Sequence, residues 1–161
     1  MIRALLLGCL LLLSACSGRP PLPEQTPNLA LPMQLHVVRL QAGQRQDWLL
    51  VIQAEDGGLR WSMMDFLGIP QARQRLIDGK WQADGLLPPN PQARELFGAL
   101  LFAFTEPARL PASYPKAEQQ GNQRHLGERW QVTYRGPQDF TVQLSQGLSY
   151  QVSPLPDEVS P

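Results

Sequence analysis

This chain has little of what most catalytic and metal sites require. It contains two histidines, His36 and His125, and two cysteines, which both fall within its first 16 residues. A zinc site needs three or four ligands in tight groups, and the sequence offers no such group. His125 and Glu128 form a lone His-x-x-Glu pair, which we expect in an exposed loop. Nucleophile-elbow and phosphate-loop motifs are missing too, so we expect neither catalytic activity nor a cofactor or metal.

The sequence also lacks an excess or a block of charge of either sign. Its 14 lysines and arginines balance its 14 aspartates and glutamates. Nucleic acids and anionic lipid surfaces attract proteins through clustered basic residues, so we expect no nucleic-acid partner. Because both cysteines lie at the N-terminal end, we expect the domain to rest on its apolar core, without a disulfide.

Cys16 ends a segment that is typical of a secretory signal. Arg3 supplies a positive charge, and an apolar stretch interrupted only by Gly8 runs to Leu13. This stretch is too short for a permanent membrane-spanning helix. Cleavage after Ala15 would leave the bulky Leu13 where ordinary signals have a small residue. The last four residues, Leu-Ser-Ala-Cys, instead resemble a bacterial lipobox, which implies that residues 1–15 are removed and Cys16 is lipidated.

The resemblance to lipoproteins also implies where the protein resides. Such proteins carry three acyl chains on the cysteine, and two or more membrane signals are enough for stable anchoring. Ser17 follows Cys16, whereas an aspartate at that place favours the inner membrane in enteric-type bacteria. We therefore expect an outer-membrane lipoprotein whose domain faces the periplasm.

Proline-rich segments flank the expected domain. Residues 16–33 are interpreted as the lipidated cysteine and a tether, since five prolines and no hydrophobic periodicity occur between Gly18 and Pro32. Proline-rich linkers extend by about 3.1 Å per residue, so this tether would hold the domain up to about 45 Å from the membrane. Residues 154–161 are expected to form a flexible tail, which leaves residues 34–153 as one folded domain.

The domain reads as strands joined by tight turns. Short apolar runs at residues 35–40, 48–54 and 59–66 predict strands. Asp56-Gly57-Gly58 and Asp78-Gly79 predict hairpins, because Asp-Gly pairs suit turns with positive φ at both central positions. The second hairpin joins residues 73–77 to 80–83. Alternating residues then predict a three-stranded meander with one apolar face at 130–134, 140–144 and 148–152.

One helix is expected between Asn90 and Pro107. Asn90 is a favoured N-cap and Pro91 suits the first helical position. Residues 96–104 carry no polar side chain, so the helix should be buried on nearly every side, although a long strand would give the same run. The expected fold is mainly β with α: a curved antiparallel sheet packed on at least one apolar helix.

Four stretches together resemble a known family. They are Asp47–Ala54 (DWLLVIQA), Leu59–Trp81 (LRWSMMDFLGIPQARQRLIDGKW), Leu86–Phe104 (LLPPNPQARELFGALLFAF) and Gly127–Tyr134 (GERWQVTY). They resemble the LolB group of outer-membrane lipoproteins, and more closely LolB-like lipoproteins linked to aryl-polyene and fatty-acid-type gene clusters. The resemblance implies a half-open β-barrel of the LolA/LolB type, whose apolar concave face accommodates acyl chains. It also implies cargo such as acyl chains or lipidated protein, delivered by a soluble periplasmic carrier.

Two alternatives stay open from the residues. Leu67 and Ile69 lie in a turn marked by Gly68 and Pro70, so they either tuck under the sheet or project as an apolar finger, the counterpart of the exposed leucine of LolB. Large apolar side chains either line an acyl groove or fill a core. The candidates for this lining are Trp48, Leu50, Ile52, Trp61, Met63, Leu96, Phe97, Leu100, Phe104, Trp130, Val132 and Tyr134. A groove favours an acyl-handling protein, and a filled core favours a structural or assembly lipoprotein that binds protein partners.

Overall fold

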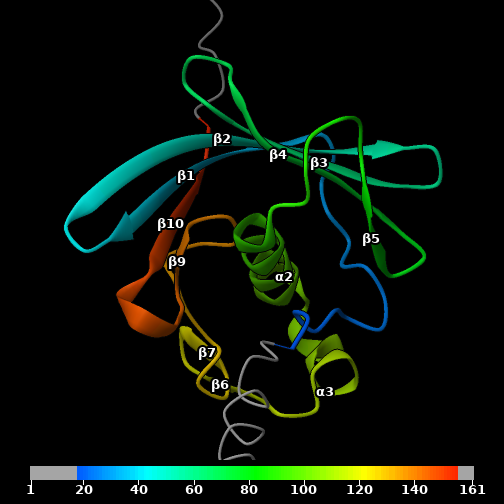
Figure 1. Cartoon of the computed structure of the whole chain (residues 1–161). Coiled ribbons are helices and arrows are strands. Elements are labelled where there is room, and N and C mark those ends of the chain that lie inside the picture. The colour runs from blue at the N-terminus through cyan, green and yellow to red at the C-terminus, as the bar shows by residue number, and fades with distance from the viewer. Residues whose placement is uncertain (1–17, 156–161) are drawn as a thin grey trace, which may run out of the picture.

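The computed structural model describes residues 18–155, which form a ten-stranded antiparallel sheet curved around one helix (Figure 1). The strands are β1 (Met33–Gln41), β2 (Gln44–Glu55), β3 (Gly58–Asp65), β4 (Pro70–Ile77), β5 (Lys80–Ala83), β6 (Ala117–Gln120), β7 (Gln123–Leu126), β8 (Trp130–Tyr134), β9 (Phe140–Gln143) and β10 (Ser149–Pro154). The helical segments are α2 (Pro91–Phe104), η2 (Pro107–Arg109), α3 (Leu110–Ser113) and η3 (Ser145–Gly147). The predicted signal peptide, residues 1–15, and Cys16 lie outside the described residues.

The sheet is built from two five-stranded meanders that meet in its centre. The strand order is β5-β4-β3-β2-β1-β10-β9-β8-β7-β6, so β1 and β10 join the halves and β5 and β6 are the edges. Val37 of β1 lies opposite Val152 of β10 in this central pairing. Helix α2 connects the meanders and lies on the concave side of the sheet (Figure 1). The prediction of a curved antiparallel sheet packed on an apolar helix is confirmed, and the unclosed sheet is consistent with a half-open barrel.

Tight turns with positive φ set the register of the first meander. Asp56 has a φ of 42° and Gly57 of 77°, and Asp78 and Gly79 repeat this at 48° and 67°. Two successive positive φ angles are the requirement of a type I′ turn, which explains the Asp-Gly pairs. Both predicted hairpins are therefore confirmed, as β2–β3 and β4–β5.

Helix α2 begins and ends where its flanking residues predict. The Asn90 side chain accepts a hydrogen bond from the Ala93 amide at 3.0 Å, and Pro91 occupies the first turn. At the other end, the Thr105 hydroxyl donates to the Leu101 carbonyl at 2.7 Å. Both terminal turns thus have side-chain partners for backbone groups that the helix cannot pair itself. The alternative of a long strand is wrong.

The all-apolar stretch of α2 fills the concave side of the sheet. Leu96, Phe97, Leu100 and Phe102 have no exposed surface. The Phe97 ring centroid lies 5.2 Å from that of Trp61 in β3, and Phe102 packs at 5.6 Å against Trp130 in β8. One helix therefore contacts both meanders and provides the common core for them.

The β6–β7 hairpin was not predicted from the sequence. Strands β6 and β7 pair antiparallel, with Glu118 opposite His125. His125 therefore lies in an edge hairpin, where the expectation of an exposed loop is wrong, whereas Glu128 does lie in the exposed β7–β8 turn. Residues 118–120 are exposed on both faces, which removes the alternation from which strands are recognised. Their strand conformation comes from pairing with β7.

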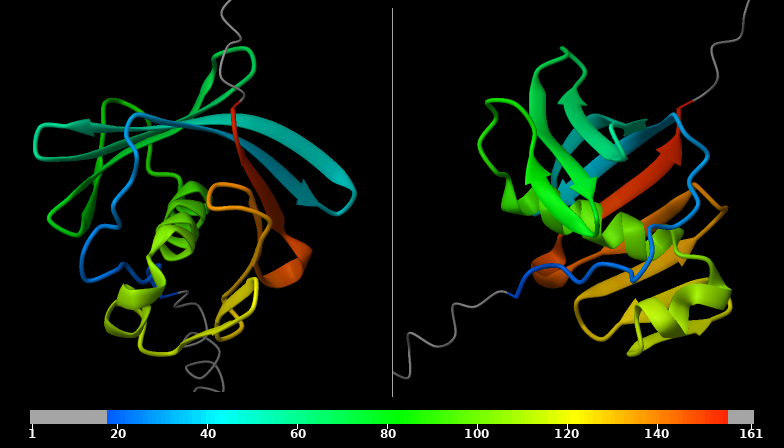
Figure 2. Two further views of the ribbon diagram at one scale, coloured as in Figure 1. Left: turned by 180° about the vertical axis from the view of Figure 1, so that it is seen from behind. Right: turned by 90° about the vertical axis from the view of Figure 1, so that its right-hand side faces the viewer.

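The expected tether does not extend away from the domain. Residues 18–32, here named the strap, cross the open side of the curved sheet between β5 and α3 (Figures 1 and 2). Pro23 and Pro27 are buried, and Leu22, Leu29 and Leu31 pack against the core. The expected reach of about 45 Å is therefore wrong for the docked strap, because its apolar side chains are buried on the domain instead of remaining in water.

The start of the expected C-terminal tail also belongs to the sheet. Pro154 ends β10 opposite Leu35, and the Leu155 amide donates to the Gln34 carbonyl at 3.2 Å. The remainder of the expected tail, residues 156–161, lies outside the described residues.

The shared core predicts a large effect for Phe97→Ala. Removing a fully buried ring that touches Trp61 and Trp81 should lower the free energy of unfolding by about 3–5 kcal/mol. Urea denaturation followed by tryptophan fluorescence measures this. Gln143→Ala, on an exposed position of β9, is the control and should change stability by less than about 0.5 kcal/mol. Equal effects of the two changes would contradict a core centred on α2.

Candidate functional site

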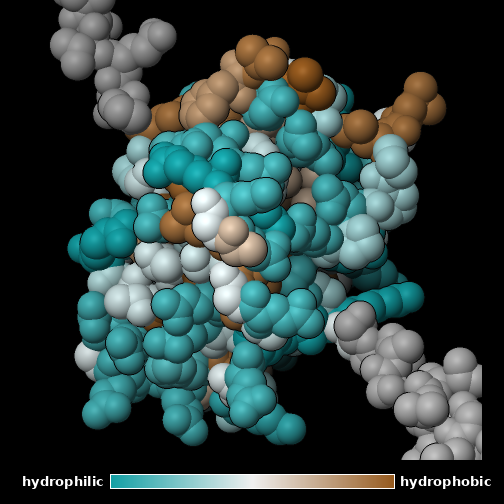
Figure 3. Space-filling model, turned by 60° about the vertical axis from the view of Figure 1, so that its left-hand side comes forward, coloured by the Kyte–Doolittle hydropathy of each residue, from teal (hydrophilic) through white to brown (hydrophobic). Residues whose placement is uncertain are grey.

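The turn between β3 and β4 carries apolar side chains into solvent. Leu67 is 85% exposed, Phe66 is 65% exposed and Ile69 is 53% exposed. We name residues 66–69 the finger. Figure 3 shows apolar residues gathered at this end of the molecule. Of the two alternatives for Leu67 and Ile69, the structure has the projecting one.

Asp65 organises the finger from its base. Its Oδ1 atom accepts hydrogen bonds from the backbone amides of Leu67 and Ile69, both at 2.9 Å. Its backbone carbonyl accepts from the Gly68 amide and its own amide donates to the Ile69 carbonyl, both at 3.0 Å. Gln71 adds a side-chain donor to Asp65 Oδ2 at 3.3 Å. The finger is thus a hydrogen-bonded turn that holds apolar side chains outward.

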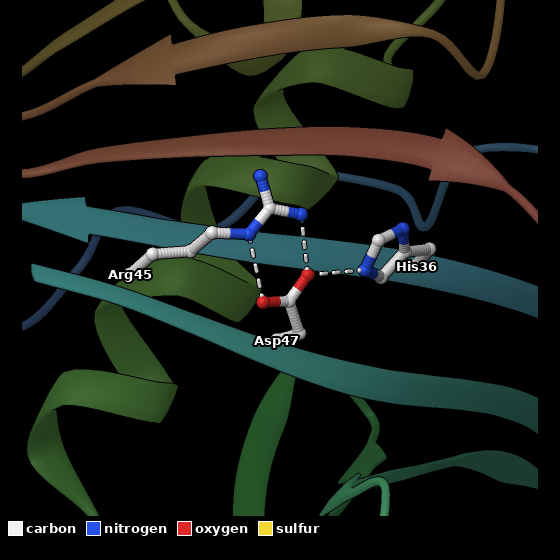
Figure 4. A network of polar contacts seen from close by, with 3 residues as sticks. All are labelled: His36, Arg45 and Asp47. Carbon is white, nitrogen blue, oxygen red and sulfur yellow. Dashed lines mark hydrogen bonds and ion pairs between the residues drawn. The ribbon is translucent and has the colours of Figure 1, made fainter.

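A polar network supports the finger from the outer face of the sheet. His36 Nε2 lies 2.9 Å from Asp47 Oδ1, and the Arg45 guanidinium donates to both oxygens of the same carboxylate (Figure 4). The His36 ring lies 5.6 Å from the Phe66 ring, so the network reaches the finger. Hydrogen bonding by Arg45, with a smaller contribution from His36, lowers the pKa of the Asp47 carboxyl from its ordinary value.

The twelve residues expected to line a groove or core lie together around α2. Trp48 is 8% exposed, Met63 is 2% exposed, and Phe104 and Tyr134 are partly buried. The remaining candidates, which have no exposed surface, are Leu50, Ile52, Trp61, Leu96, Phe97, Leu100, Trp130 and Val132. Rings within this set pack on one another, as Trp61 does at 5.2 Å from Phe97. In this structure they are core side chains in mutual contact.

Polar contacts fix α2 to the sheet along its length. At its start, Asn90 donates to the Gln71 carbonyl and Arg94 to the Gln74 side chain, both at 3.2 Å. In its first half, Glu95 accepts hydrogen bonds from Trp130 Nε1 at 2.8 Å and from the Arg129 guanidinium. In the structure described, α2 fills the concavity of the sheet and these contacts hold it there.

Arg124 holds the other end of α2 and was not found by sequence reasoning. Its Nη1 donates to the carbonyls of Phe102 and Thr105 at 2.7 and 2.8 Å, although the residue is only 2% exposed. Cations near a helix C-terminus are stabilised by the carbonyls that end there. Burial lowers the pKa of Arg124 and raises that of the neighbouring Tyr134 to about 12. The sequence shows only an arginine in a polar segment.

Three cavities border the strap. The first, the Leu29 cavity, has a volume of about 480 Å³ and lies between strap residues 28–30 and Met33, Phe104 and Tyr134. The second, the Thr26 hollow, measures about 650 Å³ and adjoins the β2–β3 and β4–β5 turns. The third, the Pro21 cavity, measures about 440 Å³ and lies against α3 and the β7–β8 turn. The strap therefore packs less completely than α2 does.

Ser113 and Lys116, which line the Pro21 cavity, have the spacing of a Ser-x-x-Lys motif. This motif was not recognised from the sequence. A serine nucleophile needs a base within hydrogen-bonding distance. Lys116 is exposed and makes no hydrogen bond with Ser113 in the structure. The pair therefore lacks the contact on which such chemistry depends.

Within the described residues we find neither a membrane-spanning helix nor a cluster of potential metal ligands. None of the helices within residues 18–155 has the length and apolarity to cross a membrane. The same part of the chain has no group of three histidine, cysteine or acidic side chains placed to hold a metal ion.

Comparisons with models of protein families and with curated protein sequences find no match to this chain.

The role of Asp65 predicts a local effect for Asp65→Ala. Removing the carboxylate leaves the Leu67 and Ile69 amides without their acceptor, so their hydrogen exchange should accelerate about tenfold or more. Global unfolding should change by about 1 kcal/mol, because the turn is exposed. Hydrogen exchange with mass spectrometry measures the first and urea denaturation the second. Asp139→Ala, at an exposed ion pair in the β8–β9 turn, serves as the control. Unchanged exchange in the finger would contradict the proposed role.

Arg45→Gln should raise the pKa of Asp47 towards the ordinary aspartate value of about 3.9. A carboxyl with a lowered folded-state pKa stabilises the fold above its unfolded pKa, and this contribution disappears as the pH falls through the folded value. Below about pH 4, wild-type stability should thus fall more steeply than that of the variant. NMR titration of Asp47 and urea unfolding at several pH values test this. An unchanged pKa would exclude Arg45 as its cause.

Proposed function

We propose that this chain is an outer-membrane lipoprotein, anchored through Cys16, that binds acyl chains or lipidated cargo in the periplasm and aids their transfer to the membrane. The observation that carries the proposal is the finger, which projects Leu67 and Ile69 from a curved, unclosed sheet. A half-open sheet around an apolar helix with a projecting apolar loop supports the LolA/LolB-like fold that the sequence resemblance implies.

The finger has the chemistry to contact acyl chains. Burying a leucine or isoleucine side chain gains about 1.5–3 kcal/mol, so two of them give a contact that is favourable yet readily reversed. A transfer protein needs this balance, because cargo bound too tightly would never reach the bilayer. The hydrogen bonds to Asp65 order the loop before any cargo arrives. They therefore reduce the conformational entropy that the loop would lose on binding.

The strap fixes the direction in which the finger would point. The Arg129 guanidinium donates to the Gly18 carbonyl at 2.9 Å, beside the β7–β8 turn, and the finger lies at the opposite end of the molecule (Figure 1). Cys16 precedes Gly18 by two residues, which span at most about 7 Å. With the strap docked, a lipidated Cys16 would hold the β7–β8 end near the bilayer. The finger would then face the periplasm, where a soluble carrier arrives with cargo.

Transfer on this proposal is passive and uses no cofactor. Cargo moves because each successive site removes more hydrocarbon from water, at about 25 cal/mol per Å² of apolar surface. The bilayer buries the acyl chain completely, so it is the final acceptor.

A second candidate function follows from the packed interior. The candidate lining residues around α2 are in mutual contact and mostly have no exposed surface, which favours a non-catalytic structural or assembly lipoprotein. Such a protein would use the finger or a sheet edge to hold a protein partner instead of an acyl chain.

The double variant Leu67→Glu with Ile69→Glu separates these functions. Both side chains are exposed, so the fold should be retained, whereas charge in the finger should slow acyl transfer by at least about tenfold. Transfer of a fluorescent palmitoylated peptide to liposomes carrying the lipoprotein measures the rate. Leu86→Glu makes the same change at a fully exposed leucine outside the finger and should leave the rate unchanged.

Three outcomes would count against the proposal. Unfolding of the double variant would mean that the turn is structural. An unchanged transfer rate would remove the finger from acyl handling, and no transfer by the wild-type protein would favour the assembly function.

A further inference from the structure

We propose that the acyl-binding site of this protein lies beneath the strap. In the structure described, the side chains of Leu22, Leu29 and Leu31 fill the space that an acyl chain would occupy. This inference rests on the proposed function and names the site at which cargo would be held. It differs from the expectation of a groove between the sheet and α2.

The concave face is not free to take an acyl chain. Phe97, Leu100 and Phe102 of α2 have no exposed surface there. Displacing the helix would also break its contacts with Gln71, Gln74 and Arg124. Gln74 and Arg124 are buried, so breaking their contacts leaves buried polar groups without a partner, which is costly. Displacing the helix is therefore costly, and a binding site that leaves α2 in place lies elsewhere along the core.

The strap is held far less firmly than α2. It pairs with no strand of the sheet between residues 18 and 32. Two hydrogen bonds between the strap backbone and the domain are found, from Arg129 to the Gly18 carbonyl and from the Asn28 amide to Glu106 at 3.2 Å. Its remaining attachment is apolar, through Leu22, Leu29 and Leu31 and the buried Pro23 and Pro27. An apolar ligand can replace an apolar attachment with little net change in buried surface.

The space beneath the strap is already partly open. The Leu29 cavity reaches Met33 in β1, Phe104 at the end of α2 and Tyr134 in β8. The Thr26 hollow and the Pro21 cavity lie further along the same segment. The lining of the Thr26 hollow includes Glu55, Asp56 and Asp78, so it is not part of an apolar site. If the strap lifts, its three leucines leave the core and extend the more apolar Leu29 and Pro21 cavities. A flexible acyl chain fits cavities extended in this way, whereas a rigid ligand would need a preformed pocket.

Gly98 offers a way to lift the strap by design. This residue lies in the middle of α2, and a Cβ atom there would come within 2.8 Å of Pro20 Cβ and 3.3 Å of Trp130 Cη2. Trp130 is packed in the core and has no exposed surface, whereas Pro20 belongs to the weakly held strap. Gly98→Ala should therefore displace the strap. Alanine is also the better helix former, so α2 itself is not weakened.

The experiment labels the lipoprotein in envelope vesicles with a photoactivatable palmitate and maps the labelled peptides by mass spectrometry. Excess unlabelled palmitate identifies saturable labelling. Hydrogen exchange of residues 18–32 reports whether the strap has lifted. Gln92→Ala, an exposed position in the same helix, is the control for a change that adds no atom against the strap.

We expect Gly98→Ala to speed hydrogen exchange in the strap and to increase saturable labelling around Met33, Phe104 and Tyr134 several-fold. The pair Pro20→Cys with Gly98→Cys provides the opposite test. A disulfide needs about 3.5–4.5 Å between Cβ atoms, so the strap has to retreat by about 1 Å to form it. This bond should lock the strap and reduce the labelling, and a reductant should restore it.

Two results would overturn the inference: a lifted strap with unchanged labelling beneath it, or undiminished labelling with the disulfide formed. If saturable labelling is then confined to the finger, the proposed acyl-handling function still holds and only its site beneath the strap is wrong. If no variant shows saturable labelling anywhere, the acyl-handling function itself fails.

Discussion

The burial of an all-apolar helix inside a curved sheet is the constraint on which the rest of this structure depends. Leu96 to Phe104 have no polar side chain, so α2 needs apolar surroundings on every side. Five strands on either side supply most of them, and their curvature follows from wrapping around a cylinder (Figure 2). The sheet remains open between β5 and β6. The strap covers α2 there, which explains why a proline-rich segment is packed against the domain.

Local chemistry made most of the fold predictable from sequence. Asp56-Gly57 and Asp78-Gly79 predict their turns because their backbone angles suit few other residues. Asn90 and Pro91 predict the start of α2 for a similar reason. Each of these features is decided by residues next to one another in the chain.

Features that depend on distant contacts were missed or left open. Residues 118–120 form a strand only because β7 lies beside them. Pro20 packs against α2 only because Gly98 has no side chain that would occupy the same space. The glycine and proline around Leu67 predict a turn, whereas its outward direction depends on how the Asp65 carboxylate caps it. For the candidate site, sequence thus identified the finger residues, while the strap and Arg124 required the structure.

The pairing of β1 with β10 has a consequence for how the chain acquires its fold. Leu35 lies opposite Pro154, so the two halves of the sheet join through residues at opposite ends of the domain. Contacts between such distant residues form slowly, because a long loop must close before they stabilise anything. The sheet also cannot be completed before its last strand has been made. The centre of the sheet, where β1 meets β10, therefore stays unformed for as long as the C-terminal strand is missing from the growing chain.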